Sequence, residues 1–422
     1  MIFRLFLVIK SLWNRRFSTL LTISSLSISV ALLIGVERVR QGARESFSGT
    51  ISKTDLIVGG RGGSMQLLLY TVFRIGNATN NISFDTYKTI KNNSQVEWTI
   101  PYSLGDSHRS FRVVGTDENF YEHYRFRGDQ ILELHEGKAA QELFDVTLGS
   151  DVAVKLEYKL GQKITLTHGA VESPSAFAHK DKPFTIVGIL KKTNTPIDKS
   201  VYITLQGMEA IHIGWQNGAP PQEDTGTTTQ NLRKEDVKVD QITSFLVRAK
   251  SRIQVLNLQR SISNYEQEPL TAIIPGVAMS ELWSTVEYAE IGLKVVSFFV
   301  IVVGLIGMLI SLYTALEARR REMAILRSVG AGVPTIAMLL VAEAFVLSVT
   351  GCIFGVGIAY AALLLARPLV EAQIGVLLPL AALSSLEWIY LAGLIASALL
   401  LGLLPSWRAV KNSLADGLTL RM

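Results

Sequence analysis

Four apolar runs, each long enough to cross a lipid bilayer, constrain the fold of this chain more than any other feature. The first run covers residues 17–37, and the other three, at 291–315, 334–366 and 387–405, follow one another closely. Residues 38–290 lie between the first and second runs and contain no further run of that length. The pattern predicts four transmembrane α-helices, with a large extracytoplasmic domain inserted between the first and second spans.

The basic residues predict how these spans are oriented. Residues 1–16 contain arginine and lysine but no acidic residue, and basic residues recur in the loop at 316–333 and in the tail at 406–422. Because cytoplasmic segments of membrane proteins carry an excess of Lys and Arg, all three segments are expected in the cytoplasm. The inserted domain and the connection at 367–386 are then outside. A cleavable signal peptide is the competing interpretation of the first run, but the run is longer than a typical signal-peptide core and no A-x-A site follows it.

Composition excludes several classes of protein and site. The formal net charge of the 422 residues is +5, but the basic residues flank the apolar runs, which indicates membrane topology rather than nucleic-acid binding. The single cysteine, Cys352, lies in an apolar run, so an internal disulfide and a multi-cysteine metal site are both excluded. The G-x-x-x-x-G-K-[ST] motif is absent, so the glycine-rich segment at 59–63 is expected to be a turn and not a phosphate site.

The inserted domain alternates between short strand patterns and short helix patterns. Apolar alternation, or a short apolar run bounded by turn residues, predicts a strand. Predicted strands cover residues 96–103, 110–116, 184–190, 200–204, 242–248 and 270–274, and predicted helices cover 83–91 and 252–263. This mixture predicts an α+β domain.

The histidines of this chain all lie in the inserted domain, where imidazoles would suit a metal site. They are His108, His123, His135, His168, His179 and His212. None of them stands at H-x₃₋₅-H spacing, and no cysteine accompanies them. We therefore expect ordinary surface histidines and no metal, cofactor or catalytic site, with metal binding in the outer domain as the alternative.

Two helical segments next to the membrane are predicted to form a stalk. Residues 38–49 continue the first span outward, and residues 278–290 lead back into the second span. Antiparallel pairing would set basic residues of the first segment against acidic residues of the second, with each exposed pair contributing only about 0–1 kcal/mol. The residues in question are Arg38, Arg40, Arg44, Glu281, Glu287 and Glu290. The alternative is two unrelated, solvated helix ends.

Small residues and one acid mark the predicted spans. Gly304 and Gly307 in the second span, and Gly351 and Gly355 in the third, would let neighbouring helices approach closely. Glu343 lies about two turns inside the third span. A carboxylate within a membrane is costly, which makes Glu343 a candidate functional residue.

The loop at 316–333 has the pattern of a short amphipathic helix at a membrane surface. Met323 and Leu326 recur at helical spacing, and Arg320 and Arg327 add positive charge. Glycines and a proline then end the helix and open the next span. The alternative is a basic connecting loop that only reflects the positive-inside rule.

The sequence resembles the FtsX/MacB-type permeases of ABC transporters in three places. REMAILRSVGAG at 321–332, followed by the intramembrane acid and the glycines of the third span, is similar to the signature of that family. GLLPSWRAVKNSLADGL at 402–418 resembles its C-terminal signature, and FTIVGIL at 184–190 resembles part of its periplasmic core domain.

This resemblance implies a specific role for each part of the chain. The loop would be the coupling helix that docks on a separate cytoplasmic ABC ATPase, through Arg320, Met323, Leu326 and Arg327. ATP would be bound by that partner, so this chain needs no cofactor. An acid at the position of Glu343 is common in the family, which favours a structural or transmissive role.

The resemblance also implies a non-catalytic, multi-pass protein of the bacterial inner membrane that works by mechanotransmission. It implies a homodimer or a paralogous heterodimer of permeases, and it leaves open a periplasmic adaptor or lipoprotein as a further partner. A lipoprotein-releasing permease is one alternative function. An ATPase-independent membrane sensor, or regulator of a periplasmic enzyme, is the alternative from another class.

Overall fold

The chain forms two compact units, and each is described by itself. The computed structural model describes residues 8, 10–169, 179, 182–213, 232–318, 332–373 and 378–415. The membrane unit consists of Met1–Gly42, Glu287–Val370 and Leu378–Met422, and the outer unit consists of Ala43–Val286 and Glu371–Leu377.

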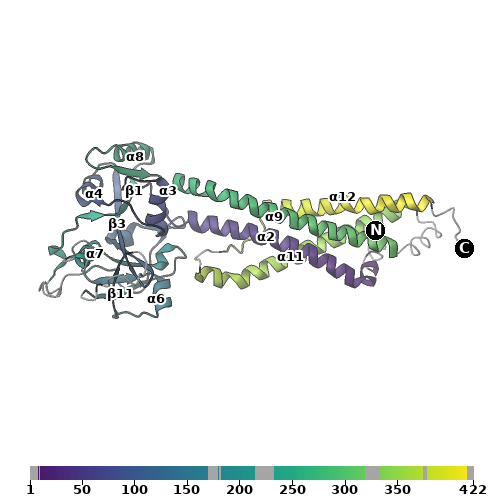
Figure 1. The fold of residues 1–422 in the computed structure, drawn as a ribbon, viewed down its shortest axis with the longest axis horizontal. Coiled ribbons are helices and arrows are strands. Elements are labelled where there is room, and N and C mark those ends of the chain that lie inside the picture. Colours follow the sequence, from purple (N-terminus) through teal and green to yellow (C-terminus); the bar gives the residue numbers. More distant parts are fainter. Residues whose placement is uncertain are drawn as a thin grey trace. The chain divides into compact units, whose positions relative to one another are not determined.

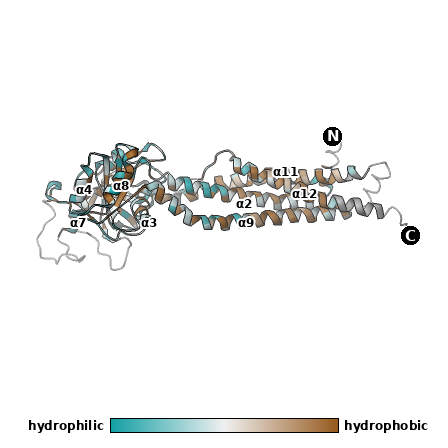
Figure 2. Ribbon diagram, turned by 90° about the horizontal axis from the view of Figure 1, so that it is seen from above, coloured by the Kyte–Doolittle hydropathy of each residue, from teal (hydrophilic) through white to brown (hydrophobic). Residues whose placement is uncertain are grey.

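Four long helices provide the framework of the membrane unit and run side by side (Figure 1). They are α2 (Arg16–Ser48), α9 (Pro275–Ala318), α11 (Val333–Gln373) and α12 (Ser385–Ala415). Each contains a stretch long and apolar enough to cross a membrane. Figure 2 shows hydrophobic residues, in brown, along most of these stretches. The predicted fold class, four spans with an α+β domain inserted after the first, is confirmed.

Helix α2 packs one face against the other three helices. Leu26, Val30 and Ile34 on this face are at most 1% exposed, and they belong to the two apolar cores of the membrane unit. Residues four apart lie on one side of an α-helix, so the spacing of these three defines the buried stripe. The stripe makes α2 the central element of the unit.

Two prolines lie inside helices that were expected to end there. The predicted third span ended at Arg367–Pro368 and the predicted fourth at Pro405, but α11 continues to Gln373 and α12 to Ala415. A proline removes one backbone hydrogen bond, and membrane helices tolerate this where neighbouring groups satisfy the freed carbonyl. The predicted external connection at 367–386 is correspondingly shorter, because α12 begins at Ser385.

The outer unit is built on a mixed sheet with the strand order β15-β1-β14-β3-β4-β12-β8-β11-β7, to which β9 and β10 are added. Its parallel pairs are β12 with β4 and β11 with β8, and the other pairs are antiparallel. The strands are β1 (Leu56–Gly60), β3 (Val96–His108), β4 (Phe111–Thr116), β7 (Leu134–Gly137), β8 (Asp145–Leu148), β9 (Lys163–Ile164), β10 (Thr167–His168), β11 (Phe184–Leu190), β12 (Ser200–Thr204), β14 (Ser244–Ala249) and β15 (Leu270–Ile273). Two small sheets pair β2 (Ile82–Ser83) with β13 (Gln241–Ile242) and β5 (Arg125–Phe126) with β6 (Gln130–Ile131).

Short helices surround this sheet, and both of its faces are buried. They are α3 (Ser64–Leu68), continued by the π-helix η1 (Leu69–Phe73), then α4 (Phe84–Lys91), α5 (Glu118–His123), α6 (Ser150–Leu156), α7 (Leu205–His212) and α8 (Val255–Ser263), with 3₁₀ turns η2 (Pro196–Lys199), η4 (Lys234–Asp236) and η5 (Arg252–Gln254). Ile57 of β1 belongs to one apolar core, while its neighbours Leu56 and Val58 belong to another. Because successive strand residues point to opposite faces, this division places one core on each side of the sheet.

Candidate functional sites

The predicted coupling residues cannot be placed on the fold. Arg320, Met323, Leu326 and Arg327 lie outside the residues that the structure describes. Their contact with an ATPase therefore stays a prediction.

The glycines of the third span lie directly against α2. A Cβ added at Gly351 would lie 2.8 Å from the Cβ of Leu26. A Cβ added at Gly355 would lie 2.6 Å from the Cβ of Val30 and 2.8 Å from the carbonyl oxygen of Ser27. Real Cβ atoms do not approach other atoms so closely, so α11 needs glycine at both positions to reach its observed distance from α2.

The glycines of the second span also face α2. A Cβ added at Gly304 would lie 2.8 Å from the hydroxyl oxygen of Ser29, whereas at Gly307 the nearest atom is the hydroxyl oxygen of Ser25, at 3.8 Å. The Ser29 hydroxyl donates a hydrogen bond of 3.1 Å to the carbonyl of Val300 on α9. A side chain at Gly304 would therefore displace the Ser29 hydroxyl, while Gly307 makes an ordinary contact.

Serines of α2 add polar links between the spans. The Ser27 hydroxyl donates to the carbonyl of Gly351 on α11 at 3.1 Å, and the hydroxyls of Ser18 and Ser311 lie 3.0 Å apart. Hydrogen bonds between membrane helices stabilise their association, because lipid offers no alternative partner. The serines in the first apolar run thus contact α9 and α11.

We predict that Gly355→Leu will destabilise the membrane unit by about 1–3 kcal/mol, because the new side chain must displace α2 or α11. Gly357→Leu is the matched control, since nothing lies within 4 Å of a Cβ added at Gly357. The measurement is the thermal unfolding temperature of each purified variant in detergent. Equal unfolding temperatures for the two variants would contradict the prediction.

Glu343 forms an ion pair within the membrane unit. Its side chain is 3% exposed and pairs with the Arg15 guanidinium, which is 19% exposed. Arg15 lies immediately before α2 and Glu343 lies on α11. The ion pair therefore links the beginning of the first helix to the third helix.

Arg38 makes a different interaction from the one predicted. It was expected in the stalk opposite the acids of residues 278–290, but its guanidinium is 1% exposed and donates to Glu387 of α12 at 2.7 Å. It also donates to the Ala382 carbonyl at 2.8 Å and to the Tyr360 hydroxyl at 3.0 Å. The stalk assignment of Arg38 is wrong because Arg38 follows Ile34 by four residues and so extends the buried stripe of α2.

Glu387 also caps its own helix. The backbone N–H of Ser384 donates to the Glu387 carboxylate at 2.6 Å, and the N–H of Glu387 donates to the Ser384 hydroxyl at 3.3 Å. This is the reciprocal capping box of an S-x-x-E sequence. The carboxylate that binds Arg38 is therefore held in place by the first turn of α12.

The stalk prediction holds for one ion pair only among the residues that the structure describes. Arg40 lies 3.4 Å from Glu290 and also binds Glu37 of its own helix. Glu281 instead accepts a hydrogen bond of 2.8 Å from Ser64. Arg44 and Glu287 form no ion pair in the described part of the chain, so their pairing stays a prediction.

Aromatic packing also joins the two stalk helices. Within the outer unit, the rings of Phe47 on α2 and Trp283 on α9 meet edge to face at 5.9 Å between centroids. Phe47 also contacts Phe73, with ring centroids 5.0 Å apart. Both rings are partly buried against the apolar core of the outer unit, and aromatic pairs of this kind contribute more to stability than exposed ion pairs do.

Two of the six histidines are not surface residues, contrary to the sequence-based expectation. His108 is 5% exposed and His179 is 0% exposed. The ring of His108 has a structural role: its Nδ1 lies 2.7 Å from the Thr165 carbonyl and its Nε2 lies 2.9 Å from the Tyr158 hydroxyl. His179 belongs to a cluster with other titratable groups.

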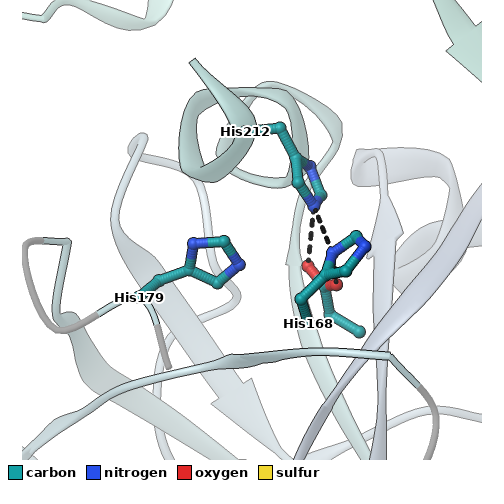
Figure 3. A group of neighbouring side chains, drawn as sticks. His168, His179 and His212 are labelled. Atoms are coloured by element: carbon teal, nitrogen blue, oxygen red, sulfur yellow. Dashed lines mark hydrogen bonds and ion pairs between the residues drawn. The ribbon is translucent and has the colours of Figure 1, made fainter. Parts of the chain in front are cut away.

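The fold brings three histidines and one aspartate together. Strand β10 pairs with β3 so that His168 lies directly opposite Asp106, and opposite residues of an antiparallel pair point to the same face. His212 is the last residue of α7. The backbone N–H of His179 donates to the Leu166 carbonyl at 2.8 Å, which holds His179 beside β10. Figure 3 shows the three imidazole rings turned toward one another.

The distances within this Asp106–His168–His179–His212 cluster are short. The Nδ1 of His168 lies 3.2 Å from the Nε2 of His212 and 3.2 Å from one carboxylate oxygen of Asp106. The other Asp106 oxygen lies 3.4 Å from the Nε2 of His212. One nitrogen or oxygen from each of the four residues can be chosen so that all lie within 4.8 Å of one another.

The charges in the cluster support one another. Burial raises the pKa of Asp106, but the neighbouring His168 and His212 imidazoles have the larger combined effect and lower this pKa to about 2. Burial lowers the pKa of His212, yet the Asp106 carboxylate raises it above its usual value overall. Asp106 is therefore a carboxylate at neutral pH, buried where it attracts a positive charge.

Spacing along the chain could not reveal this cluster. Its four members come from β3, β10, the segment before β11 and α7, and they are far apart in the sequence. Motif searches for metal sites depend on ligands within one turn or hairpin. The residues meet only because the sheet pairs β10 with β3.

Among the solved structures that this chain resembles are two of low sequence identity. The periplasmic region of MacB from Actinobacillus actinomycetemcomitans is 12% identical, with a TM-score of 0.34, over 56% of this chain and 96% of that one. The extracellular domain of the noncanonic ABC-type transporter YknZ from Gram-positive bacteria is 9% identical, with a TM-score of 0.30, over 52% of this chain and 99% of that one. A comparison with curated proteins found no match.

Two family models match this chain, one over its first part and one over its last part. The model described as MacB-like periplasmic core domain matches residues 19–265, more than half of the chain. The model described as FtsX-like permease C-terminal matches residues 294–414. The predicted family is confirmed: this chain belongs to the FtsX/MacB-type ABC transporter permeases.

Proposed function

We propose that this chain is the membrane subunit of a mechanotransmission ABC transporter, in which a separate cytoplasmic ATPase drives movements of the outer unit. The observation that carries this proposal is that one chain matches both the MacB-like core domain and the FtsX-like permease domain. These movements would export a substrate, or extract it from the inner membrane or the periplasm. ATP would be bound and hydrolysed by the partner, which fits the absence of a phosphate-loop motif from the sequence.

Two continuous helices support a mechanical role. Helix α9 ends at Ala318, within the first residues of the predicted coupling segment at 316–333, and begins at Pro275 in the outer unit. Helix α2 likewise has residues in both units. A displacement of the coupling segment would act on one end of α9, and the Arg40–Glu290 ion pair and the contacts of Gly304 would couple α9 to α2. An α-helix resists compression along its axis because its hydrogen bonds run in that direction.

The proposed topology places both termini and the coupling segment in the cytoplasm and residues 38–290 outside, in a bacterial inner membrane. The basic bias of residues 1–16, 316–333 and 406–422 supports it. The permease would act as a homodimer or a paralogous heterodimer, with an adaptor or lipoprotein as a further partner in the periplasm. A lipoprotein-releasing permease would share this topology and differ in its cargo.

We expect Met323→Asp and Leu326→Asp to abolish binding of the ATPase, and Arg320→Ala to weaken it much less. Interfaces depend chiefly on a few buried apolar anchors, and charges at the rim contribute less. The measurement is co-purification of a co-expressed ABC ATPase partner, together with the ATPase activity of the complex. The expression level of each variant in the membrane is the control for folding.

Three results would overturn the proposal. Normal co-purification with both aspartate variants would show that the segment is only a basic loop. ATP turnover by the purified chain alone would contradict the assignment of catalysis to a partner. If no ATPase co-purified with the unmodified chain, an ATPase-independent sensor would be the better assignment.

A further inference from the structure

We propose that Asp106, His168, His179 and His212 form a binding site for one divalent transition-metal ion of the Zn²⁺ type in the outer unit. The site would offer three imidazole nitrogens and one carboxylate oxygen. Zn²⁺ is held by combinations of His and Asp in four-coordinate, tetrahedral sites. The harder ions Mg²⁺ and Ca²⁺ prefer oxygen ligands, so three imidazoles select against them.

The separations of the donor atoms fit a tetrahedral ion. Metal–ligand distances of about 2.0–2.1 Å place the corners of a tetrahedron about 3.4 Å apart. The His168 nitrogen lies 3.2 Å from the His212 nitrogen and 3.2 Å from Asp106, and the His212 nitrogen lies 3.4 Å from Asp106. The longest separation among the four donors is at most 4.8 Å, so binding requires a movement on the order of 1 Å.

These three donors form a triangle, which hydrogen bonding alone does not explain. A hydrogen bond joins one donor and one acceptor almost linearly. Here the Nδ1 of His168 faces both the His212 nitrogen and the Asp106 carboxylate at the same distance. Neither Asp106 oxygen accepts a hydrogen bond of normal geometry from the described residues, although imidazole nitrogens lie 3.2 and 3.4 Å away. The donors converge on a shared point, as ligands of one ion do.

The remaining nitrogen of His212 is held as it is in known metal sites. Its Nδ1 lies 2.9 Å from the Met208 carbonyl, one turn earlier in α7. A carbonyl can only accept, so Nδ1 carries a proton and Nε2 is the nitrogen that faces the cluster, where it would offer its lone pair to an ion in exchange for any proton it holds. Such an outer hydrogen bond fixes the orientation and tautomer of histidines that bind metals.

The surrounding structure supports the site and leaves it open to solvent. The buried Lys182 donates from its ammonium group to the Ile211 and Ile213 carbonyls, at 3.3 and 2.8 Å, and so anchors the end of α7 that carries His212. The His168 side chain is 45% exposed and provides an entry path for an ion. A bound ion would join β3, β10 and α7 and would stabilise the folded outer unit.

The test uses the full-length chain, purified in detergent without a histidine tag and freed of metal with a chelator. We expect calorimetric titration with Zn²⁺ to give one ion per chain and a higher thermal unfolding temperature. Co²⁺ added in place of Zn²⁺ should give the strong visible absorption of a tetrahedral ion.

His168→Ala is the decisive variant, because its partly exposed side chain can be removed without leaving a cavity. We expect it to weaken Zn²⁺ binding roughly 100-fold or more, since even removal of an outer hydrogen-bond partner weakens metal sites about 10–100-fold. His135→Ala is the matched control, an exposed histidine of the same unit that lies outside the cluster, and it should bind Zn²⁺ as the unmodified chain does.

Three outcomes would overturn the proposal. If the unmodified chain bound no stoichiometric Zn²⁺, the four residues would be an Asp–His hydrogen-bonded cluster only. If His168→Ala and His135→Ala bound Zn²⁺ equally well, the ion would lie elsewhere. If His212→Ala, folded by circular dichroism, retained full affinity, α7 would not contribute to the site.

Discussion

Arg38→Met is expected to lower the free energy of unfolding of the membrane unit by about 3–5 kcal/mol, the cost of removing one partner from a buried ion pair. The side chains of Arg38 and Glu387 are 1% and 0% exposed, so water cannot replace the lost guanidinium. The variant would leave a buried carboxylate facing a methionine. Near a lipid bilayer this cost is not reduced by solvent.

The matched double variant is Arg38→Met with Glu387→Gln. Glutamine at this position keeps the capping box with Ser384, because its side-chain oxygen still accepts from the Ser384 N–H. The double variant therefore removes both charges and preserves the first turn of α12. We expect it to recover at least half of the loss caused by Arg38→Met, because a neutral pair needs no counter-charge.

The measurement is the thermal unfolding temperature of the three proteins in one detergent, followed by tryptophan fluorescence. A double variant no more stable than Arg38→Met would show that the contacts of Arg38 with Tyr360 and the Ala382 carbonyl, and not the ion pair, matter most. Glu387→Gln alone completes the double-mutant cycle and separates the pairwise energy from the individual contributions.

The main architecture could be predicted from the sequence because its signals are local. A long apolar run identifies a membrane helix whatever its neighbours are. FTIVGIL and SVYIT form β11 and β12 at the predicted bounds of 184–190 and 200–204, since each is a short apolar run between turn residues. By contrast, β3 extends to His108, five residues beyond its predicted end at 103, because its pairing with β4 and β10 continues it.

The ion pair between Arg38 and Glu387 was not predicted, although the sequence contains signals for the position of each residue. Arg38 continues the four-residue spacing of Leu26, Val30 and Ile34, which places it on the buried face of α2. The S-x-x-E sequence that ends at Glu387 is a recognisable helix start. Neither signal says which helices are neighbours, so the pairing itself depends on tertiary structure.

The Asp106–His168–His179–His212 cluster shows a different limit. Its members have no common motif, because each comes from a separate element of the outer unit. Only the register of β10 on β3 sets His168 opposite Asp106. Strand register between distant segments depends on the packing of the whole sheet, which local patterns do not determine.

Exchanging the charges of Arg15 and Glu343 in a double variant should restore most of the stability that is lost when either charge alone is reversed. Glu343→Arg sets two cations together, and Arg15→Glu sets two acids together. Because the Glu343 side chain is 3% exposed, we expect each single variant to lose about 3 kcal/mol or more. The double variant Arg15→Glu with Glu343→Arg again pairs opposite charges, so its unfolding temperature should return most of the way to that of the unmodified chain.

The double reversal also decides the role of Glu343. If Glu343 only joins the beginning of α2 to α11, as its ion pair with Arg15 indicates, the positive and the negative residue can exchange places without loss of function. The complex with the ATPase should then regain its ATPase activity together with its stability. If Glu343 carried protons, arginine could not replace it, since a guanidinium stays protonated throughout the physiological range. A double variant that is stable but inactive would therefore contradict a structural role and favour proton transfer at this position.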